Sequence, residues 1–413
     1  MAEKIVLAYS GGLDTTVATR WLQEERGYEV HCLTVDLGKL PDIESAKRRG
    51  AEAGAVTVDV IDAKQDFLRH FVFPALQANL VYERAYPLAT ALGRPLIAKL
   101  LVDKAHEIGA TAIAHGCTGK GNDQVRLDVG VQTLAPELTI VGTMRETQMS
   151  RDEALRYAAS HNLTVHQTAE SPYSVDENLW GRSIEAGVLE DPWVAPPEEV
   201  YLWTKPIDQT PDTPTVVEIS FEEGVPVALD GEATDPVALV QRLSDLGGEH
   251  GIGRIDMVEN RLVGIKSREI YEAPAAVILL DAHRALEQLT LSKQQQRWKD
   301  QVAIEYADLV YNGLWFTAHH RDLSTYVRST QRHVTGDVRM RLWRGTHTVL
   351  GRRAERSLYS EALATYGDND QFDQSHAQGF IKLHGLAAQV QAHRQLFTEP
   401  GDPLLMAGDR DED

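Results

Sequence analysis

The chain has only two cysteines, Cys32 and Cys117, among its 413 residues. Two cysteines are too few for the disulfide framework of a small secreted domain, and neither has the spacing of a metal-binding cluster. The sequence also has no apolar run long enough to cross a membrane and no apolar core of a secretory signal. We therefore expect a cytoplasmic protein from a reducing compartment, without a membrane partner.

Basic residues are in the minority: 41 Lys and Arg stand against 61 Asp and Glu, a net charge of −20. Because phosphate backbones require a basic surface, this balance argues against nucleic acid as the main partner. It also means that an anionic ligand needs a local cationic pocket. We find no internal repeat or low-complexity tract, and the length suits two or three domains with a large core.

The N-terminal stretch is the most informative part of the sequence. A short apolar strand at residues 5–9 (IVLAY) leads directly into SGGLDTT at residues 10–16, and Leu13, Val17 and Trp21 follow at helical spacing. The start of a helix offers unpaired N–H groups and the positive end of its dipole to an anion. Adjacent glycines let the backbone approach phosphate oxygens closely. The stretch therefore predicts a phosphate or pyrophosphate site.

Two other phosphate motifs fit this turn poorly. A Walker loop requires lysine where Leu13 stands, and a dinucleotide fingerprint requires three spaced glycines. The remaining alternative is a tight turn that merely starts a helix. The serine before the glycines and the Asp-Thr-Thr after them favour phosphate binding.

Strands and helices alternate through the first part of the chain. We expect strands at 4–9, 29–35, 57–61, 112–115 and 139–141, and helices at 15–25, 44–53, 65–73, 97–108, 124–134 and 151–161. This order predicts an α/β fold with a doubly wound parallel sheet. Ligands of such sheets bind beyond the carboxyl ends of the strands, where the turn at 10–12 and the segment 115–119 fall.

Beyond about residue 170 the pattern becomes α+β. Hairpins are expected at 215–229 and 337–353, and helices at 235–246 (capped by Thr234), 274–289, 292–308 and 377–397. We expect three domains: a nucleotide-binding domain at 1–168, an α+β domain at 169–370, and a C-terminal helix with an acidic tail at 371–413. The last residues, 408–413, are expected to be disordered.

A second glycine-rich segment, GCTGKGNDQVR at residues 116–126, follows another predicted strand. Its glycines expose backbone N–H groups, and Lys120 and Arg126 supply positive charge. Asp123 could bind the amino group of a ligand. Alternatively, Asn122 or Asp123 could simply cap the helix at 124–134.

Three further segments give weaker signals. In YPLATALGRP at residues 86–95, Tyr86 could belong to the core and Arg94 to the surface. The segment 173–178 (YSVDEN) is interpreted as a polar loop. The charged, strand-like segment 259–271 has the spacing of a solvated face.

These motifs together resemble the argininosuccinate synthase family, a member of the ATP pyrophosphatase (PP-loop) group, over about residues 4–383. The first turn is shared by several activities of the group. The segments HGCTGKGNDQVR at 115–126 and VENRLVGIKSREIY at 258–271 are specific to the family. The segments YSVDENL at 173–179 and GVLEDP at 187–192 resemble it as well.

The resemblance implies a ligase that joins L-citrulline and L-aspartate into argininosuccinate through a citrullyl-adenylate, releasing AMP and pyrophosphate in arginine biosynthesis. ATP is then a substrate, Mg²⁺ accompanies it without a direct protein ligand, and the second domain completes the citrulline site. The C-terminal helix is implied to build a homotetramer.

The site residues also follow from the resemblance. The implied ATP contacts are Ala8, Tyr9, Ser10, Gly11, Gly12, Leu13, Asp14, Thr15, Thr16, Val35 and Gly116. The implied aspartate contacts are Thr118, Asn122 and Asp123. The implied citrulline contacts are Tyr86, Asn122, Arg126, Ser174, Ser183, Glu259 and Tyr271. Asp14, Asp123 and Arg126 are the expected catalytic residues.

The chain departs from the family pattern in two places. It has Ala89-Thr90-Ala91 where many members have Gly-Thr-Ser, so that Thr90 or a backbone N–H would have to replace the serine hydroxyl. Lys39 stands where a glutamine is usual, and we have no functional account of it.

Two other functions are compatible with the first turn. Another ATP pyrophosphatase, amidating or tRNA-thiolating, would need a glutaminase domain in the first case, and a reactive cysteine pair with a basic surface in the second. A nucleotide-binding sensor would need the first turn but not the segment 259–271, whose presence favours the enzyme.

Overall fold

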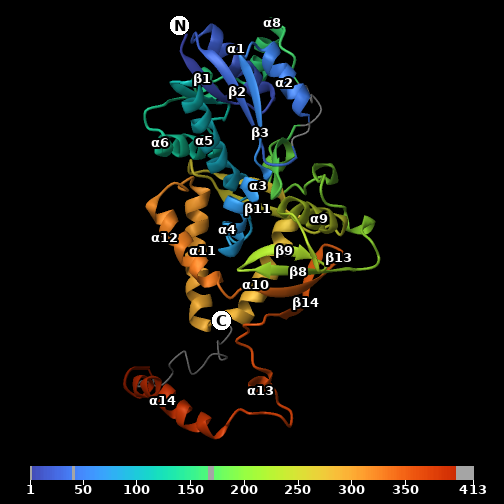
Figure 1. Ribbon diagram of the computed structural model, residues 1–413, viewed down its shortest axis with the longest axis vertical. Helices are drawn as coiled ribbons and strands as arrows, with labels where there is room; N and C mark the ends of the chain where they lie inside the picture. The colour runs from blue at the N-terminus through green and yellow to red at the C-terminus, as the bar shows by residue number, and fades with distance from the viewer. Residues whose placement is uncertain (1, 40–41, 166–171, 397–413) are drawn as a thin grey trace, which may run out of the picture. The chain divides into compact units, whose positions relative to one another are not determined.

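The computed structural model describes residues 2–39, 42–165 and 172–396 (Figure 1). The chain divides into two compact units, Met1–Leu358 and a second that begins at Tyr359, and each is described by itself. The first unit contains most of both domains predicted at 1–168 and 169–370. The boundary predicted between them lies outside the described residues, and this division stays a prediction.

The N-terminal part of the first unit is a sheet of five parallel strands in the order β3-β2-β1-β4-β5. The strands are β1 (Lys4–Ala8), β2 (Glu29–Asp36), β3 (Thr57–Asp62), β4 (Ala112–His115) and β5 (Thr139–Gly142). The chain moves from β1 to β2 on one side and later adds β4 on the other side, where Ala8 pairs with His115. The sheet therefore has its topological switch point between β1 and β4, where ligands of such folds bind.

Helices cover both faces of this sheet (Figure 1). In β1, Ile5 and Leu7 pack toward α1 (Leu13–Glu24) and α2 (Ile43–Glu52), whereas Val6 packs toward α5 (Ala89–Ile108) and α6 (Asn122–Leu134). Successive side chains of a strand point to opposite faces, so a strand that is apolar throughout is buried on both sides. The predicted doubly wound α/β sheet is confirmed.

Helix α5 starts eight residues before the predicted helix at 97–108 and runs through Pro95. Leu88 precedes it with a left-handed backbone (φ 64°), and the Tyr86 hydroxyl accepts hydrogen bonds from the N–H groups of Thr90 (2.8 Å) and Ala91 (3.3 Å). A phenol thus takes the place of an ordinary side-chain cap. The predicted helix begins only after Pro95, because proline is disfavoured inside a helix.

The remaining helices of the N-terminal part differ from prediction mainly at their ends. The helix predicted at 65–73 is α3 (Lys64–Phe67), a π-helical turn at Leu68–Val72 and α4 (Phe73–Gln77). After β5 come α7 (Thr143–Thr147) and α8 (Arg151–Ser160).

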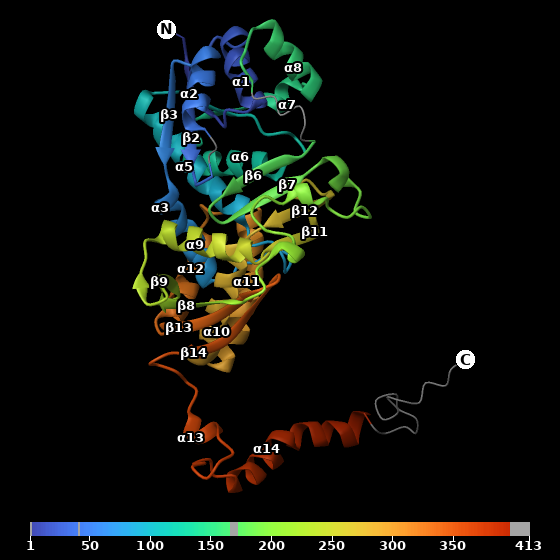
Figure 2. The ribbon, with the colours of Figure 1, turned by 90° about the vertical axis from the view of Figure 1, so that its right-hand side faces the viewer.

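A four-stranded antiparallel sheet, ordered β11-β12-β7-β6, lies next to the parallel sheet (Figure 2). It consists of β6 (Ser174–Asn178), β7 (Gly181–Glu185), β11 (Arg254–Asn260) and β12 (Lys266–Glu272). The polar loop predicted at 173–178 is wrong, because this segment is strand β6, which pairs with β7. At its end, the Leu179 N–H donates to the Leu37 carbonyl oxygen at 3.0 Å, which ties this sheet to the end of β2.

A second antiparallel sheet has the order β10-β9-β8-β13-β14 and confirms both predicted hairpins. Its strands are β8 (Thr215–Glu222), β9 (Val225–Leu229), β10 (Glu232–Ala233), β13 (Gly336–Trp343) and β14 (Thr346–Arg353). Three short 3₁₀ turns precede it, at Gly187–Glu190, Glu198–Val200 and Ile207–Gln209.

Four helices pack with this sheet around the largest hydrophobic core. They are α9 (Pro236–Glu249), α10 (Pro274–Thr290), α11 (Lys293–Tyr311) and α12 (Ala318–Gln331). The cap predicted at Thr234 is wrong: the Asp235 carboxylate accepts from the first N–H groups of α9, because Asp235 directly precedes the proline that starts the helix. Helix α12 was not predicted.

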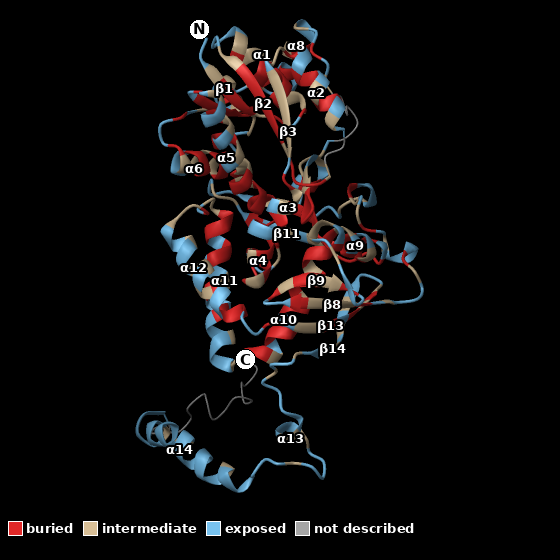
Figure 3. Ribbon diagram, viewed as in Figure 1, coloured by how far each residue is buried: buried red, intermediate tan, exposed pale blue. Residues whose placement is uncertain are grey.

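The second unit contains α13 (Glu361–Ala364) and α14 (Ser375–Gln391), followed by a π-helical turn at Ala392–Leu396. The end of the predicted helix, residue 397, lies outside the described residues, as does the tail. Every residue of α14 is exposed or half-buried (Figure 3). Along the part of the chain that the structure describes, no helix combines the length and the apolar character needed to cross a membrane.

Candidate functional site

A few hydrogen bonds fix the conformation of the turn between β1 and α1. The Ser10 hydroxyl accepts from the Gly12 N–H at 3.3 Å and lies 3.2 Å from the Thr15 hydroxyl. Gly11 has φ +75°, and a Cβ there would lie 2.9 Å from both the Ala46 Cβ and Arg49 Nη2. Arg49 Nε donates to the Gly11 carbonyl oxygen at 3.0 Å. Glycine is therefore required at position 11 by the fold itself.

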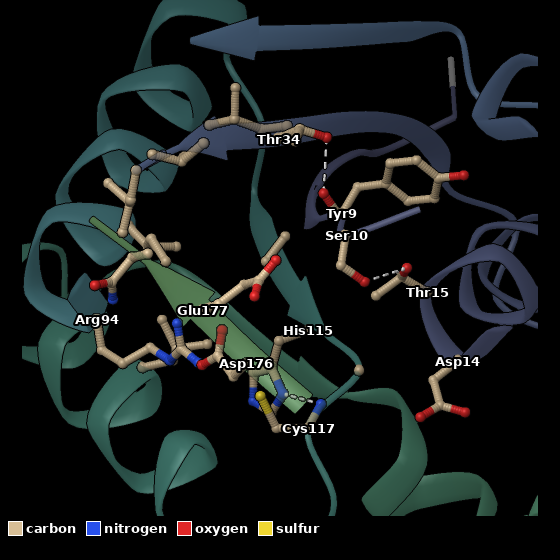
Figure 4. Close-up of a pocket in the computed structure, with 18 of the residues that line it drawn as sticks. Tyr9, Ser10, Asp14, Thr15, Thr34, Arg94, His115, Cys117, Asp176 and Glu177 are labelled. Atoms are coloured by element: carbon tan, nitrogen blue, oxygen red, sulfur yellow. Dashed lines mark hydrogen bonds and ion pairs between the residues drawn. The ribbon is translucent and has the colours of Figure 1, made fainter. Parts of the chain in front are cut away.

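A cavity of about 290 Å³ lies beyond the carboxyl ends of β1, β2 and β4 (Figure 4). Its wall includes these predicted ATP contacts: Ala8, Tyr9, Ser10, Asp14, Thr15, Val35 and Gly116. The other predicted ATP contacts lie in the turn or in the first turn of α1, outside this wall: Gly11, Gly12, Leu13 and Thr16. Their N–H groups belong to the predicted phosphate site, whereas the Thr16 side chain is buried against the Tyr9 hydroxyl.

A second cavity, of about 360 Å³, lies between α5, α6 and the four-stranded sheet. Its wall holds every predicted citrulline contact: Tyr86, Asn122, Arg126, Ser174, Ser183, Glu259 and Tyr271. Of the predicted aspartate contacts, Asn122 and Asp123 line it, and Thr118 lies in an exposed turn before Gly121. The structure thus brings together residues that are up to 185 positions apart, from Tyr86 to Tyr271.

The two cavities share part of their walls. Ser10, Gly116, Arg94 and Asp176 line both of them. Arg94 and Asp176 are in contact, and Figure 4 shows them on the side of the nucleotide cavity opposite Asp14. A nucleotide in the first cavity and an amino acid in the second would therefore meet at these residues.

A half-buried set of charges centres on Asp123. Its two carboxylate oxygens accept from Arg94 Nη2 at 2.7 Å and from Arg126 Nη1 at 3.0 Å. Burial by itself raises the pKa of Asp123, but the charges of both arginines outweigh it and hold that pKa at about 2. Helix α6 begins at Asn122, with Gly121 as its N-cap and without a side-chain cap. The alternative that Asn122 or Asp123 merely caps this helix is therefore wrong.

Arg126 keeps one donor for a ligand. Its Nε donates to the Tyr311 carbonyl oxygen at 2.8 Å, whereas its Nη2 is buried and finds no acceptor among the described residues. The residue is only 4% exposed. A buried cationic donor without a partner is costly, and a ligand carboxylate would satisfy it.

Glu259 is a buried carboxylate with two phenol partners. The hydroxyls of Tyr271 and Tyr311 each donate to one of its oxygens at 2.7 Å. Burial raises the pKa of Glu259, and the two phenols lower it. The solvated face that the spacing suggested is wrong for this residue, which is 2% exposed, because Tyr271 and the end of α11 cover its carboxylate.

The departure from the family pattern at 89–91 has a structural counterpart. Thr90 lies in the wall of the second cavity, and the Ala91 N–H is turned toward the Tyr86 hydroxyl. Because the N–H groups of Thr90 and Ala91 already donate to Tyr86, the Thr90 side chain is the replacement that this position offers. Lys39 lies with its ammonium 4.9 Å from the centre of the Trp203 ring, and no function follows from this contact.

A second charge cluster lies at the rim of this cavity. Arg261 Nη2 donates to Glu269 at 2.6 Å and also contacts Glu185. Burial raises the pKa of Glu269 to about 8, and the charge of Glu185 adds to the increase. Between an unfolded pKa of about 4.3 and this value, the folded protein holds a proton that the unfolded chain has lost. Stability should therefore fall as pH rises through this window.

We expect Glu269→Gln to remove this pH dependence. The neutral amide has no charge to bury, so the variant should melt at least about 2 °C above the unmodified protein at pH 8.5 and close to it at pH 5. Thermal unfolding at both pH values checks this. Glu198→Gln is the control, since Glu198 pairs with Arg254 at an exposed position. An equal gain at both pH values would contradict the prediction.

Three residues of the site were missed or left undecided by the sequence. Arg94 lies in the second turn of α5, where it is half-buried between the carboxylates of Asp123 and Asp176. Asp176 is two residues after Ser174 in β6, so both side chains point to the same face of the strand. The interpretation of the segment as a loop does not use this period of two. Tyr311 follows the end of the helix predicted at 292–308, and nothing around it marked it.

A parallel sheet of this order, with one cavity at its switch point and a second, charge-lined cavity sharing part of its wall, is typical of the α/β folds that bind nucleotides. Two family models match: the arginosuccinate synthase N-terminal HUP domain over residues 4–164 and the arginosuccinate synthase C-terminal domain over residues 173–391. The chain belongs to the argininosuccinate synthase family, whose members are ligases.

Curated relatives agree along nearly the whole chain. An argininosuccinate synthase of Dehalococcoides mccartyi is 54% identical over 97% of this chain and 98% of its own length. Those of Thermosynechococcus vestitus and Shouchella clausii are 53% and 51% identical, over 95% and 94% of this chain and 98% and 96% of their own lengths. Among solved structures, a tRNA thiolase of Methanococcus maripaludis aligns at 17% identity over 42% of this chain and 61% of its own, with a TM-score of 0.27.

Proposed function

We propose that this chain joins L-citrulline and L-aspartate into argininosuccinate at the expense of ATP, as a step of arginine biosynthesis. The observation that carries the proposal is the second cavity, whose wall holds all the citrulline contacts implied by the family and adjoins the nucleotide cavity. The particular contacts of ATP, aspartate and citrulline stay predictions, as does a cytoplasmic location.

The chemistry proceeds in two displacements. The ureido oxygen of citrulline attacks the α-phosphorus of ATP, and pyrophosphate leaves. The aspartate amine, after losing a proton, attacks the activated ureido carbon, and AMP leaves with the original ureido oxygen. Holding three substrates in line could lower the barrier by about 7–11 kcal/mol, and donors fixed around the α-phosphate would stabilise the developing charge.

The charges of the cavity suggest distinct roles for its residues. Asp123, with a pKa of about 2, is too weak a base to accept a proton at neutral pH. We infer that it holds the aspartate amino group by charge, while Arg126 offers its free Nη2 to a substrate carboxylate. Asp14 lines the nucleotide cavity, where burial raises its pKa and the charge of Arg151 lowers it.

Mg²⁺ is proposed to enter with ATP. Among residues 2–39, 42–165 and 172–396, no group of three or more His, Cys, Asp or Glu side chains is placed to hold a metal. Mg²⁺ commonly keeps several waters and binds through substrate phosphates, so this donor set suits an ion held mainly by the β- and γ-phosphate oxygens. Bound there, it would neutralise charge on the leaving pyrophosphate.

An assay of products tests the proposed function. Protein with ATP, Mg²⁺, citrulline and aspartate should yield AMP and pyrophosphate, and neither should appear when citrulline is omitted. With citrulline labelled by ¹⁸O in the ureido group, the label should appear in AMP. Formation of ADP, or an unlabelled AMP, would rule out the proposed reaction.

A homotetramer built through α14 is part of the proposal. Phe380, Leu383 and Val390 recur at helical spacing and are 50–76% exposed. An apolar stripe of this kind on one helix usually marks an interface, and a further copy of the chain is the occupant that the family resemblance implies.

We expect glutamates at Phe380, Leu383 and Val390 to dissociate the tetramer, because three charges would be buried in its interface. Light scattering after gel filtration should show a fall from tetramer mass to that of a smaller species. Glutamates at Gln378, Lys382 and Gln389, on the opposite side of α14, form the matched control. If both triple variants keep the tetramer mass, α14 is not the assembly element.

A further inference from the structure

Tyr311, the last residue of α11, touches several assigned site residues but has no assigned role itself. Its hydroxyl donates to Glu259 Oε1 at 2.7 Å and accepts from Asn122 Nδ2 at 2.8 Å. Tyr311 is 1% exposed. It therefore joins Asn122, at the start of helix α6, to Glu259, in strand β11 of the four-stranded sheet.

The direction of these hydrogen bonds is fixed. The Asn122 oxygen accepts from the Leu262 N–H at 2.9 Å, which leaves the amide nitrogen to face Tyr311. A phenol has a single proton, and a carboxylate can only accept. The Tyr311 proton therefore goes to Glu259, and the hydroxyl oxygen accepts from Asn122.

Tyr311 also holds Arg126. Its carbonyl oxygen accepts from Arg126 Nε at 2.8 Å, and its ring centre lies 4.7 Å from the guanidinium carbon. The ring also stacks on Tyr82, at 3.6 Å between centres, and meets the Tyr86 ring edge-on at 6.5 Å. Two residues later, Gly313 has φ +77°, and a Cβ there would lie 2.8 Å from the Arg126 Cα. The segment after α11 thus packs closely against the backbone of Arg126, where a side chain at position 313 would clash.

Glu259 and Arg126 are the two charged groups that Tyr311 contacts. Arg126 has a free donor for a carboxylate, and Glu259 is an acceptor for an ammonium group. Together they match the α-carboxylate and α-ammonium groups of a free amino acid. Their separation decides whether both groups can be bound at once, and Tyr311 is bonded to each of them.

We infer that Tyr311 is a positioning residue that sets the spacing of Arg126 and Glu259, and so governs the affinity for the amino-acid end of citrulline. This inference rests on the proposed function. Tyr311 does not touch the reacting ureido group in this role. It acts through the two charges that grip the opposite end of the substrate.

Tyr311→Phe tests the inference because it keeps the ring, the stack and the carbonyl oxygen. The loss of a buried hydrogen bond to a charged group should raise the KM and the Kd for citrulline about tenfold or more. The KM values for ATP and aspartate should stay within about twofold. The acidic limb of kcat/KM for citrulline should also move to higher pH, because Glu259 loses a donor that lowers its pKa.

Tyr306→Phe is the matched control. Tyr306 lies on the same helix, is equally buried, and its hydroxyl bonds to His320 Nε2 at 2.8 Å away from both cavities. Tyr306→Phe should lower the melting temperature about as much as Tyr311→Phe does, while its affinity for citrulline stays unchanged. A citrulline KM raised equally in both variants would assign Tyr311 a structural role only, and would overturn the inference.

The outcomes separate the inference from the proposed function. If the unmodified protein forms no citrulline-dependent AMP, the proposed function fails. If it does form AMP and Tyr311→Phe binds citrulline normally, the inference alone fails. In a Glu259→Gln background, Tyr311→Phe should have less than half of its single effect on citrulline affinity, measured by calorimetry. Full additivity would also overturn the inference.

Discussion

Gly12→Val should abolish productive ATP binding while the protein remains folded. Gly12 has an extended backbone (φ −80°, ψ 179°) that any residue adopts, and the nearest atom to an added Cβ is Ser10 Oγ at 3.4 Å. The unliganded turn thus has room for a side chain. The predicted phosphates would occupy that same room, so a branched side chain should weaken ATP binding by about 100-fold or more.

Calorimetric titration with a non-hydrolysable ATP analogue measures this effect, and circular dichroism checks the fold. Gly11→Ala is the informative comparison, because a Cβ at Gly11 would collide with Ala46 and Arg49 and demand a strained backbone. We expect Gly11→Ala to lower the melting temperature, and Gly12→Val to lower only nucleotide affinity. A folded Gly12→Val protein with ordinary ATP affinity would refute the assignment of this turn to phosphate binding.

Asp123→Asn should lower kcat/KM for aspartate about 30-fold to 5,000-fold. The substitution keeps the shape of the side chain but removes the negative charge that the half-buried Arg94, the buried Arg126 and the substrate amine would share. Removing one member of a buried charge cluster commonly costs about 2–5 kcal/mol. Because the pKa of Asp123 is held at about 2, the carboxylate is charged throughout the working range, and the variant should be impaired at every pH from 5 to 9.

Measuring kcat/KM of the Asp123→Asn variant for each of the three substrates shows which of them Asp123 serves. The kcat/KM for ATP should fall least, since Asp123 does not line the first cavity and reaches it only through Arg94. The kcat/KM for citrulline should fall less than that for aspartate but measurably, because Asp123 also accepts a hydrogen bond from Arg126 Nη1 at 3.0 Å and so orients it. An equal loss for all three substrates would remove Asp123 from the task of holding the aspartate amine.

Local signals were sufficient for the parallel sheet and the first turn. Residues of β1 are apolar on both faces, and its turn carries the glycines that the backbone needs, so each could be predicted from its own residues. Helix α5 could not. Its first two turns depend on the Tyr86 hydroxyl meeting the N–H groups of Thr90 and Ala91, a contact that overrides the local signal of Pro95.

The polar part of the site depended on contacts between distant segments. Strand β6 is rich in polar residues, and only its pairing with β7 makes it a strand. From its own segment, Arg94 is expected to be a surface charge. In the structure it pairs with Asp123 and Asp176, which are 29 and 82 positions away in the sequence. The family resemblance supplied Glu259 and Tyr271, whereas Tyr311 was not available from any motif.

Arg94 belongs to the walls of both cavities, and this has a thermodynamic consequence. A ligand on one side that alters the orientation or charge pairing of its guanidinium alters the free energy of binding on the other side. Such coupling is necessarily mutual: the factor by which bound nucleotide changes the affinity for an amino acid equals the factor by which that amino acid changes the affinity for nucleotide. Cooperative loading of the substrates can thus arise within one subunit, without any exchange between copies of the chain.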